Sequence, residues 1–469
     1  MVKRICLGLA LLAGVPAWAQ STTTDTQQSP AATDASQSAD TTQQVDTTQT
    51  PSATEAPMEL PPPVTGQVYP TQVGSDVQQN YLGLGVSGSA GYVDNVLAGY
   101  STVKTSSEIY TLAPSISYNK KTPRTTAQFS YNPGFTFYSQ VSELNEVDEN
   151  AAGMFQYRIT PHFVYRMQDS FTKSSSVYGL SSPGLGGAIT GSLPVALQGL
   201  VAQFADRIIN SATVDLGLQT GENTLVGAEG SFAELDYPNS EQVPGLINSN
   251  SIGASGFYTH RVTTHQYLGF IYQYTQVLTY LSGSEGQATL NTFSPFYSFY
   301  LLRTKQGNLT ASLQGGLEHA SFIIRGRPFV AEWTPDVTAS LGWQGPVTNF
   351  AVSYTRSVAG GGGLDGLFVE SGYNGTAQWK FTRDWRMSAG ASYSALKNDT
   401  LQYDPQIYKG HSIYGAASVG RTLGKDARFE VGYNHVHQTY PGITALSQNP
   451  DSNRIYGSIT YQLTRPIGR

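Results

Sequence analysis

A glycine pattern near residue 85 has the spacing of a dinucleotide-binding turn. Gly83, Gly85 and Gly88 fit G-x-G-x-x-G within YLGLGVSGSAGY, residues 81–92. Such a turn binds a pyrophosphate only where a strand precedes it and a helix follows, because the helix N-terminus then meets the phosphates. Here polar residues precede the pattern, no helical pattern follows, and apolar and small residues alternate along it. We therefore interpret the stretch as a β-strand and expect no nucleotide. The run Gly360–Gly363 is followed by no lysine that could hold a phosphate.

Histidine side chains are the second group that could do chemistry. His435 and His437 lie two residues apart, so they share one face if the segment is a strand. Two imidazoles could hold part of a metal site, but no third ligand is evident, and no carboxylate neighbours them in sequence. No Gly-x-Ser-x-Gly sequence marks a hydrolase nucleophile. We therefore predict no catalytic residue, no metal and no cofactor, and keep a rim-site membrane enzyme as an alternative.

The first 79 residues differ from the rest of the chain. A positive start (Lys3 and Arg4), an apolar run and a small-residue cleavage site are typical of a secretory signal peptide over residues 1–19. The only cysteine, Cys6, lies inside it, so we expect no disulfide in the mature chain. Residues 20–79 are rich in Ser, Thr, Gln, Asp and Pro and poor in apolar residues. This composition predicts a disordered, acidic tail in the periplasm.

The composition favours a membrane-spanning β-barrel over residues 80–469. Only 13% of the 469 residues are charged, against about 25% in ordinary domains, and the chain holds 49 Gly and 29 Tyr. The mean hydropathy of -0.25 is low, as expected where strands alternate lipid-facing and water-facing side chains. The net charge is -6 and there is no basic run, so nothing supports a nucleic-acid partner.

Apolar and polar residues alternate with period two from residue 80 onward, in runs of roughly ten to fifteen residues, as in half-buried strands. In 366–381 the polar face holds Glu370, Asn374, Thr376, Gln378 and Lys380. The predicted lipid face of the same segment holds Leu367, Val369, Tyr373, Ala377, Trp379 and Phe381. A soluble propeller would show a repeat of fixed length with recurring motifs, and no such repeat is found.

The connections between these runs alternate short and long. We count eight short turns, such as 119–124 and 382–384. Nine longer segments lie at about 94–107, 140–149, 175–207, 237–249, 281–287, 323–330, 359–366, 398–409 and 440–452. Short turns on one side and long loops on the other are typical of bacterial outer-membrane barrels. The count predicts about eighteen antiparallel strands with both ends in the periplasm, since the number is even.

The chain resembles the porin-like β-barrels of Gram-negative outer membranes, including poorly characterised ones associated with exopolysaccharide systems. The resemblance rests on pattern and covers 80–469. It implies outer-membrane lipid and the barrel-assembly machinery as partners, and it allows a homotrimer. Such barrels often end in an aromatic residue that the assembly machinery reads. This chain ends in Arg469, so Tyr461 or Leu463 would serve instead.

The alternation also predicts which charged side chains line the lumen. Barrels of about 16–18 strands leave an aqueous channel. The predicted pore-lining residues carry both signs, so no strong ion selectivity is expected from them. They are Arg166, Glu229, Glu332, Asp336, Glu370, Lys380, Arg386, Arg428 and Glu430.

The long segment 175–207 has a helical pattern at its end. In SLPVALQGLVAQFADRI, Leu197, Val201 and Phe204 recur at helical spacing. In general porins the third outer loop folds into the lumen, so by resemblance this loop is a candidate constriction. We therefore expect a passive outer-membrane channel for small hydrophilic solutes. The alternatives are export of a polysaccharide, whose hydroxyl groups would suit a polar lumen, and the rim-site enzyme.

Overall fold

The computed structural model describes residues 80–175, 206–238, 246–281, 284–324, 330–360, 363, 367–397, 409–441 and 447–467. They form eighteen strands and one 3-10 turn, Ser142–Leu144. The strands are β1 (Tyr81–Val93), β2 (Ser107–Lys121), β3 (Thr125–Tyr138), β4 (Glu146–Thr160), β5 (Phe163–Ser174), β6 (Arg207–Gly221), β7 (Thr224–Asp236), β8 (Asn248–Thr263), β9 (Gln266–Leu281), β10 (Ser284–Thr304), β11 (Gly307–Ile324), β12 (Val330–Gln344), β13 (Thr348–Gly360), β14 (Leu367–Trp379), β15 (Trp385–Lys397), β16 (Lys409–Leu423), β17 (Ala427–Thr439) and β18 (Asp451–Pro466).

The predicted signal peptide (1–19) and acidic tail (20–79) lie outside the described residues. Among the residues that the structure does describe, no helix has both the length and the apolar character needed to cross a membrane.

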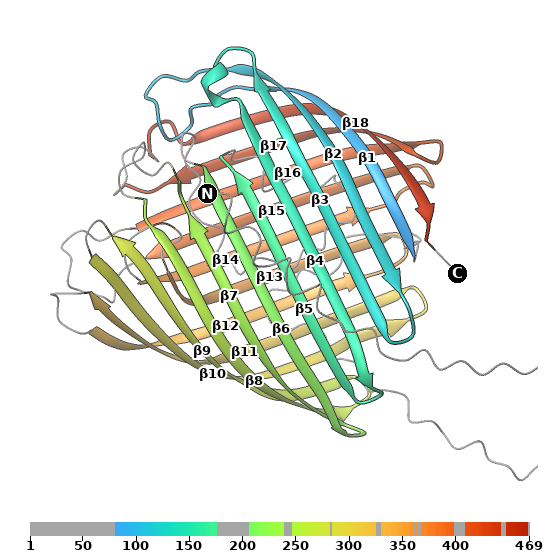
Figure 1. Cartoon of the computed structure of the whole chain (residues 1–469), viewed down its shortest axis with the longest axis vertical. Helices are drawn as coiled ribbons and strands as arrows, with labels where there is room; N and C mark the ends of the chain where they lie inside the picture. Colours follow the sequence, from blue (N-terminus) through green and yellow to red (C-terminus); the bar gives the residue numbers. More distant parts are fainter. Residues whose placement is uncertain are drawn as a thin grey trace, which may run out of the picture. The chain divides into compact units, whose positions relative to one another are not determined.

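All eighteen strands belong to one antiparallel sheet that closes on itself. Each strand pairs with its sequence neighbours, and β1 pairs with β18 from Tyr81↔Pro466 to Val93↔Arg454. In Figure 1 the cyan and green strands of one wall cross the orange and red strands of the other, because the strands of a barrel tilt relative to its axis. The predicted all-β barrel of about eighteen strands is therefore confirmed.

The connections at one end of the barrel are short, with two to five residues between consecutive strands, as predicted. One segment predicted as long, 281–287, is not: β9 ends at Leu281, β10 begins at Ser284, and the two strands stay paired to these residues. The chain enters and leaves the barrel at the short-turn end, where the Ile467 N–H donates to the Asn80 carbonyl at 2.8 Å. Short turns face the periplasm in outer-membrane barrels, so we name this the periplasmic end and the other the outer end.

The outward face of the sheet is apolar. Along β9 the alternate side chains of Leu268, Phe270 and Tyr272 are about half exposed, whereas Tyr267 and Val277 on the other face are buried. The same alternation recurs around the barrel, on strands as far apart as β1 and β11. An exposed apolar band of this extent belongs in lipid, because soluble proteins rarely expose large contiguous apolar patches. The chain is a membrane-spanning β-barrel of the outer-membrane type.

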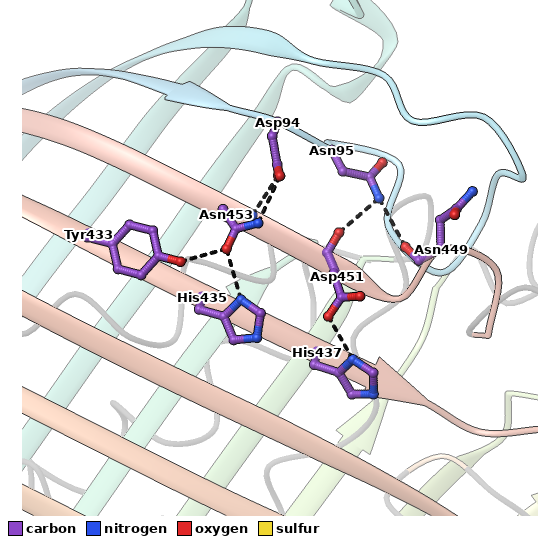
Figure 2. A network of polar contacts seen from close by, with 8 residues as sticks. All are labelled: Asp94, Asn95, Tyr433, His435, His437, Asn449, Asp451 and Asn453. Carbon is purple, nitrogen blue, oxygen red and sulfur yellow. Dashed lines mark hydrogen bonds and ion pairs between the residues drawn. The ribbon is translucent and has the colours of Figure 1, made fainter.

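A polar network closes the seam between the first and last strands at the outer end (Figure 2). Asn453 of β18 donates to both carboxylate oxygens of Asp94, from its backbone N–H at 2.7 Å and from Nδ2 at 2.8 Å. Asn95 Nδ2 donates to the Asp451 carbonyl at 2.9 Å, and Ser452 Oγ donates to the Asn95 carbonyl at 2.6 Å. These bonds fasten the segment after β1 to β18, so they oppose opening of the barrel at its seam.

Removing the Asp94 carboxylate is expected to destabilise the barrel at its seam. Asp94→Ala takes away the acceptor of two hydrogen bonds, and bonds to charged groups contribute about 1.5–3 kcal/mol each. We expect the free energy of unfolding to fall by about 2 kcal/mol, measured from the urea midpoint of the refolded protein in detergent. Glu108→Ala, which removes an exposed carboxylate from neighbouring β2, is the control. Equal midpoints for the two variants would contradict the seam assignment.

Candidate functional site: the lumen

Eight of the nine predicted pore-lining residues lie on the inner faces of strands. Seven of them occupy positions that alternate with exposed apolar residues of the same strand. Arg166 of β5 is placed by its pairing with Asp215, which alternates with the exposed Val214 and Leu216 of β6. The ninth, Lys380, follows the last residue of β14 and lies in the periplasmic connection, where its N–H donates to the Val347 carbonyl at 2.8 Å. The strand ends at Trp379, two residues before the end of the predicted segment 366–381.

Three of these residues form one cluster near the periplasmic end. Arg428 and Glu430 of β17 form an ion pair, with 2.5 Å between Nη2 and Oε2, and Arg386 of β15 interacts electrostatically with both. Glu430 also accepts from Tyr456 Oη at 3.1 Å, and the Arg454 guanidinium lies 5.2 Å from the centre of the Tyr456 ring. Alternation places each residue on the inner face, but only the registers of the successive pairs from β15 to β18 bring them together. We name these five residues the arginine cluster.

A second group lies on β5, β6 and β7. Arg166 is opposite Asp215, and Asp215 is opposite Glu229, so the three side chains form one row on the inner wall. Arg166 Nη2 also donates to Gln156 Oε1 at 3.4 Å. Asp215 was not among the predicted residues, although its alternation with the apolar Val214 and Leu216 would have placed it there.

The inner faces of β11 to β14 carry acids instead. Asp336 Oδ2 accepts from Ser294 Oγ at 2.7 Å and from Gln314 Nε2 at 3.3 Å. Glu370 Oε1 accepts from Ser394 Oγ at 2.8 Å. These carboxylates are buried beside hydroxyl and amide donors, and Glu332 lies on the same face of β12. Glu318 of β11 is a further buried acid that sequence reasoning missed. The inner arginines on β15, β17 and β18 thus lie across the barrel from the acids on β6 and β7, and the acids on β11 and β12 lie between these two groups.

Glycines on the inner face make room for aromatic rings that lie flat against the wall. A Cβ on Gly269 of β9 would lie 2.4 Å from the Phe296 ring, and one on Gly432 of β17 would lie 2.5 Å from Tyr456 Cζ. Each ring therefore covers a glycine of the neighbouring strand instead of projecting into the lumen. This arrangement gives the abundant glycine of the chain a role in keeping the lumen wide.

Filling one of these glycine positions is expected to narrow the lumen. In Gly432→Val the new side chain displaces the Tyr456 ring from the wall and from Glu430. Overpacking of this kind lowers the free energy of unfolding by about 1–3 kcal/mol, and single-channel conductance should fall. Gly457→Val is the matched control, because a Cβ at Gly457 meets no atom within 4 Å. Adding Tyr456→Ala to Gly432→Val should restore conductance; if it does not, Tyr456 is not the obstruction.

The outer end of the β13–β14 hairpin bends into the barrel. Val358, Leu367 and Val369 occupy positions that alternation assigns to lipid, yet Val358 and Leu367 are buried. All three belong to a cluster with inner-face residues of β9, β10 and β11, namely Val277, Ala288, Leu290, Ala320 and Phe322. The prediction that Leu367 and Val369 face lipid is therefore wrong. Side chains still alternate between the two faces of β13 and β14, but the outer ends of these strands bend into the barrel.

Backbone pairing confirms this inward bend. β12 pairs with β13 only over residues 337–344, so β13 leaves the wall above that level. The Val358 N–H, freed from the wall, donates to Glu318 Oε2 of β11 at 2.7 Å. Glu318 thus satisfies a backbone donor of a strand that is not its neighbour in the sheet.

Residues from nearly opposite walls meet at this hairpin. Tyr237 follows β7 and Tyr440 follows β17, which are eight strands apart in one direction around the barrel and ten in the other. Gly363 lies against Tyr237: a Cβ there would be 2.8 Å from the Tyr237 hydroxyl, and its φ of +113° suits glycine. The Ile247 N–H donates to the Gly363 carbonyl at 2.8 Å.

Tyr440 reaches the same place from the other side. It is buried, and burial raises the pKa of its phenol well above the ordinary value; Glu370 and Tyr237 add to this electrostatically. Gly410 makes room for its ring, since a Cβ at Gly410 would overlap it. We name Tyr237, Gly363 and Tyr440 the outer crossing. Nothing in the sequence pattern indicated it, because each residue lies in a connection. The predicted constriction residues Leu197, Val201 and Phe204 lie outside the described residues.

The histidine pair lies on the outer face of β17 and contacts the seam network (Figure 2). His435 Nδ1 is 2.9 Å from Asn453 Oδ1, and His437 Nδ1 is 2.9 Å from Asp451 Oδ1. The carboxylate that the local sequence lacks therefore comes from β18. In the part of the chain that the structure describes, no three His, Cys, Asp or Glu side chains are grouped as a metal site would require.

Searches with protein-family models and against curated proteins find no match to this chain. The structure is similar to OpdL of Pseudomonas aeruginosa, with 10% identity, 82% of this chain and 99% of that chain covered, and a TM-score of 0.38. OccK2 (OpdF) of the same organism has 10% identity, coverages of 83% and 100%, and a TM-score of 0.39. The ferric-catecholate import receptor Fiu of E. coli K12 has 9% identity, coverages of 85% and 84%, and a TM-score of 0.41. Similarity at this level assigns neither a family nor a solute to this chain.

Proposed function

We propose that the barrel is an outer-membrane channel through which small hydrophilic solutes diffuse passively. The closed eighteen-strand barrel with a polar inner face carries this proposal, since barrels of this size enclose an aqueous lumen. Charges of both signs around the inner face favour a weakly selective path over a strongly anion- or cation-selective one. The lining comprises Arg166, Glu229, Glu332, Asp336, Glu370, Arg386, Arg428 and Glu430, with Lys380 at the periplasmic opening.

The outer crossing is the narrow point of this path in our proposal. Its support is the meeting of Tyr237 and Tyr440 at the inward hairpin, from positions on nearly opposite walls. Loop 175–207 is a second contributor in the proposal. The rest of the chain fits the same role: residues 1–19 direct secretion, residues 20–79 lie in the periplasm, and the barrel-assembly machinery inserts residues 80–469.

Single-channel conductance of the refolded mature protein in a planar bilayer tests the proposal. A second variant lacks residues 192–208. Stable conductance steps in the full protein establish a diffusion channel. Silence in the full protein with large steps in the deletion variant identifies loop 175–207 as a plug and favours a gated exporter of polysaccharide. Silence in both, with folded protein verified by its heat-dependent gel mobility, contradicts the channel.

A further inference from the structure

The periplasmic end of the barrel is strongly basic. Within the described chain, its connections carry five Lys and Arg, and the last three residues of each strand at this end carry nine more. The same positions hold three acidic residues, Glu222, Asp384 and Asp426. Like charges gathered in this way repel one another, so this end of the barrel is suited to an anionic partner.

Six of these cations face the lumen and form a ring around its periplasmic opening. Each occupies an inward position within the last three residues of its strand, and no Asp or Glu of the described strands faces inward at this level. Their strands are spread around the whole wall (Figure 1). We name as the mouth ring the residues Lys121, Arg158, Arg261, Arg303, Arg386 and Arg428.

Pairing and ring contacts place these side chains on the inner face. Arg261 is directly opposite Tyr267, which is buried on that face. The Arg303 guanidinium lies 5.3 Å from the centre of the Tyr300 ring, and that ring is 6.4 Å from the Tyr267 ring. Glu430, one residue farther into the lumen, already accepts from Arg428 and from a tyrosine hydroxyl. The charge of the ring as a whole is therefore not balanced by the strands that carry it.

The chain enters the barrel beside the mouth ring. The Lys121 N–H donates to Asn80 Oδ1 at 2.8 Å, and Asn80 directly precedes β1. Asp76 is four residues before Asn80, so it lies at most about 14 Å from it. The opening is roughly 36 Å wide between backbones, for eighteen strands about 4.8 Å apart and tilted by about 40°. The segment 55–79 is therefore long enough to reach every member of the ring.

We propose that residues 55–79 bind the mouth ring and neutralise part of its charge. Charge complementarity supports this occupant, because the segment holds Glu55, Glu59 and Asp76 and no Lys or Arg. An opening lined by one sign of charge attracts the opposite sign more strongly than isolated surface residues do. Attachment to β1 also keeps the segment at a high effective concentration near the ring. The proposal uses the topology of the barrel but not its channel activity.

The distance between the segment and the far side of the opening tests this inference. Cys6 is the only cysteine and precedes residue 20, so spin labels can be attached to the mature protein at Ala56→Cys and at Gln306→Cys in the exposed β10–β11 turn. Pulsed electron paramagnetic resonance in mild detergent measures their separation. We expect the two labels to lie within the width of the opening, below about 40 Å.

Neutralising the segment should release it. Glu55→Gln/Glu59→Gln/Asp76→Asn should lengthen the mean separation by about 10 Å and broaden its distribution, because a released chain of this length spreads over about 25–30 Å. Raising the salt concentration to about 1 M, where the Debye length is about 3 Å, should have the same effect. Asp25→Asn/Asp34→Asn/Asp40→Asn is the matched control, since it removes the same charge from outside the segment, and it should leave the separation unchanged.

Variants of the barrel test the other partner. Arg158→Gln/Arg303→Gln should lengthen the separation, whereas Arg124→Gln/Lys425→Gln, in exposed turns outside the ring, should not. Equal separations in the native protein and in the neutralised segment overturn the proposal, with folding verified by heat-dependent gel mobility. Release of the segment in vesicles of phosphatidylethanolamine and phosphatidylglycerol overturns it as well, because lipid phosphates then occupy the ring.

Discussion

Shortening the inward hairpin is expected to give the largest rise in conductance. Replacing residues 358–369 with Asn-Gly joins Ser357 to Glu370, which are already paired, through a two-residue turn. The change removes Val358, Leu367 and Val369 together with Gly363 of the outer crossing. Tyr237 then loses its packing partner across the opening. Single-channel conductance in a planar bilayer should increase several-fold.

A milder double variant tests the same point if the barrel with the shortened hairpin folds poorly. Val358→Ala/Leu367→Ala weakens packing of the hairpin against Ala320 and Phe322 without changing chain length. Loss of buried side-chain volume loosens the hairpin, so we expect frequent open–closed transitions in the current. Val352→Ala, on the same face of β13 but 53% exposed, should leave the current quiet. If conductance is unchanged in both hairpin variants, the outer crossing does not limit flow.

Removing Glu430 is expected to give the largest loss of stability among point variants. The Glu430 side chain is 6% exposed and accepts from Arg428 at 2.5 Å and from Tyr456 at 3.1 Å. Glu430→Ala leaves Arg428 beside Arg386 with no carboxylate between them. Breaking a buried ion pair on one side costs about 3–5 kcal/mol, and Arg428 is partly exposed, so we expect about 3 kcal/mol. The urea midpoint in detergent measures this loss.

Two further variants distinguish the effect of the unpaired Arg428 charge from the effects of lost packing and of removing any carboxylate. Arg428→Met/Glu430→Leu removes both charges and should recover most of the lost stability, because an apolar pair of similar volume leaves no uncompensated charge. Glu234→Ala removes an exposed carboxylate of β7 and should leave the midpoint unchanged. Reversal potentials in a KCl gradient should shift towards anion selectivity in Glu430→Ala alone. A double variant as unstable as Glu430→Ala would show that packing, not charge, sets the effect.

The face on which a side chain lies could be predicted wherever a strand stays in the wall. Arg166, Glu229 and Arg428 lie inward, as alternation requires, since successive residues of a strand point to opposite faces. Asp215 and Glu318 follow the same rule and could have been predicted. Lys380 falls in a connection because the end of a strand depends on pairing with the next strand, which period-two alternation does not specify.

Grouping of side chains could not be predicted, because it depends on register. The meeting of Arg386, Arg428 and Tyr456 requires the offsets between β15, β16, β17 and β18. The same holds for His437 and Asp451, which are separated by a long connection. A shift of one residue in any pairing would send these side chains to the other face.

The sequence by itself determined the period-two alternation, the alternation of short turns with longer segments, and hence a closed barrel of about eighteen strands with a polar interior. These are local properties, because each depends on residues within a few positions of one another. Only the tertiary structure decided that the β13–β14 hairpin leaves the wall and that Tyr237 and Tyr440 meet at it. The physical reason is that Val358, Leu367 and Val369 carry the same local pattern as lipid-facing residues, and apolar side chains are stabilised equally by lipid and by an apolar inner wall. Which of the two they meet depends on Phe322, Ala320 and Val277, which lie far away in sequence.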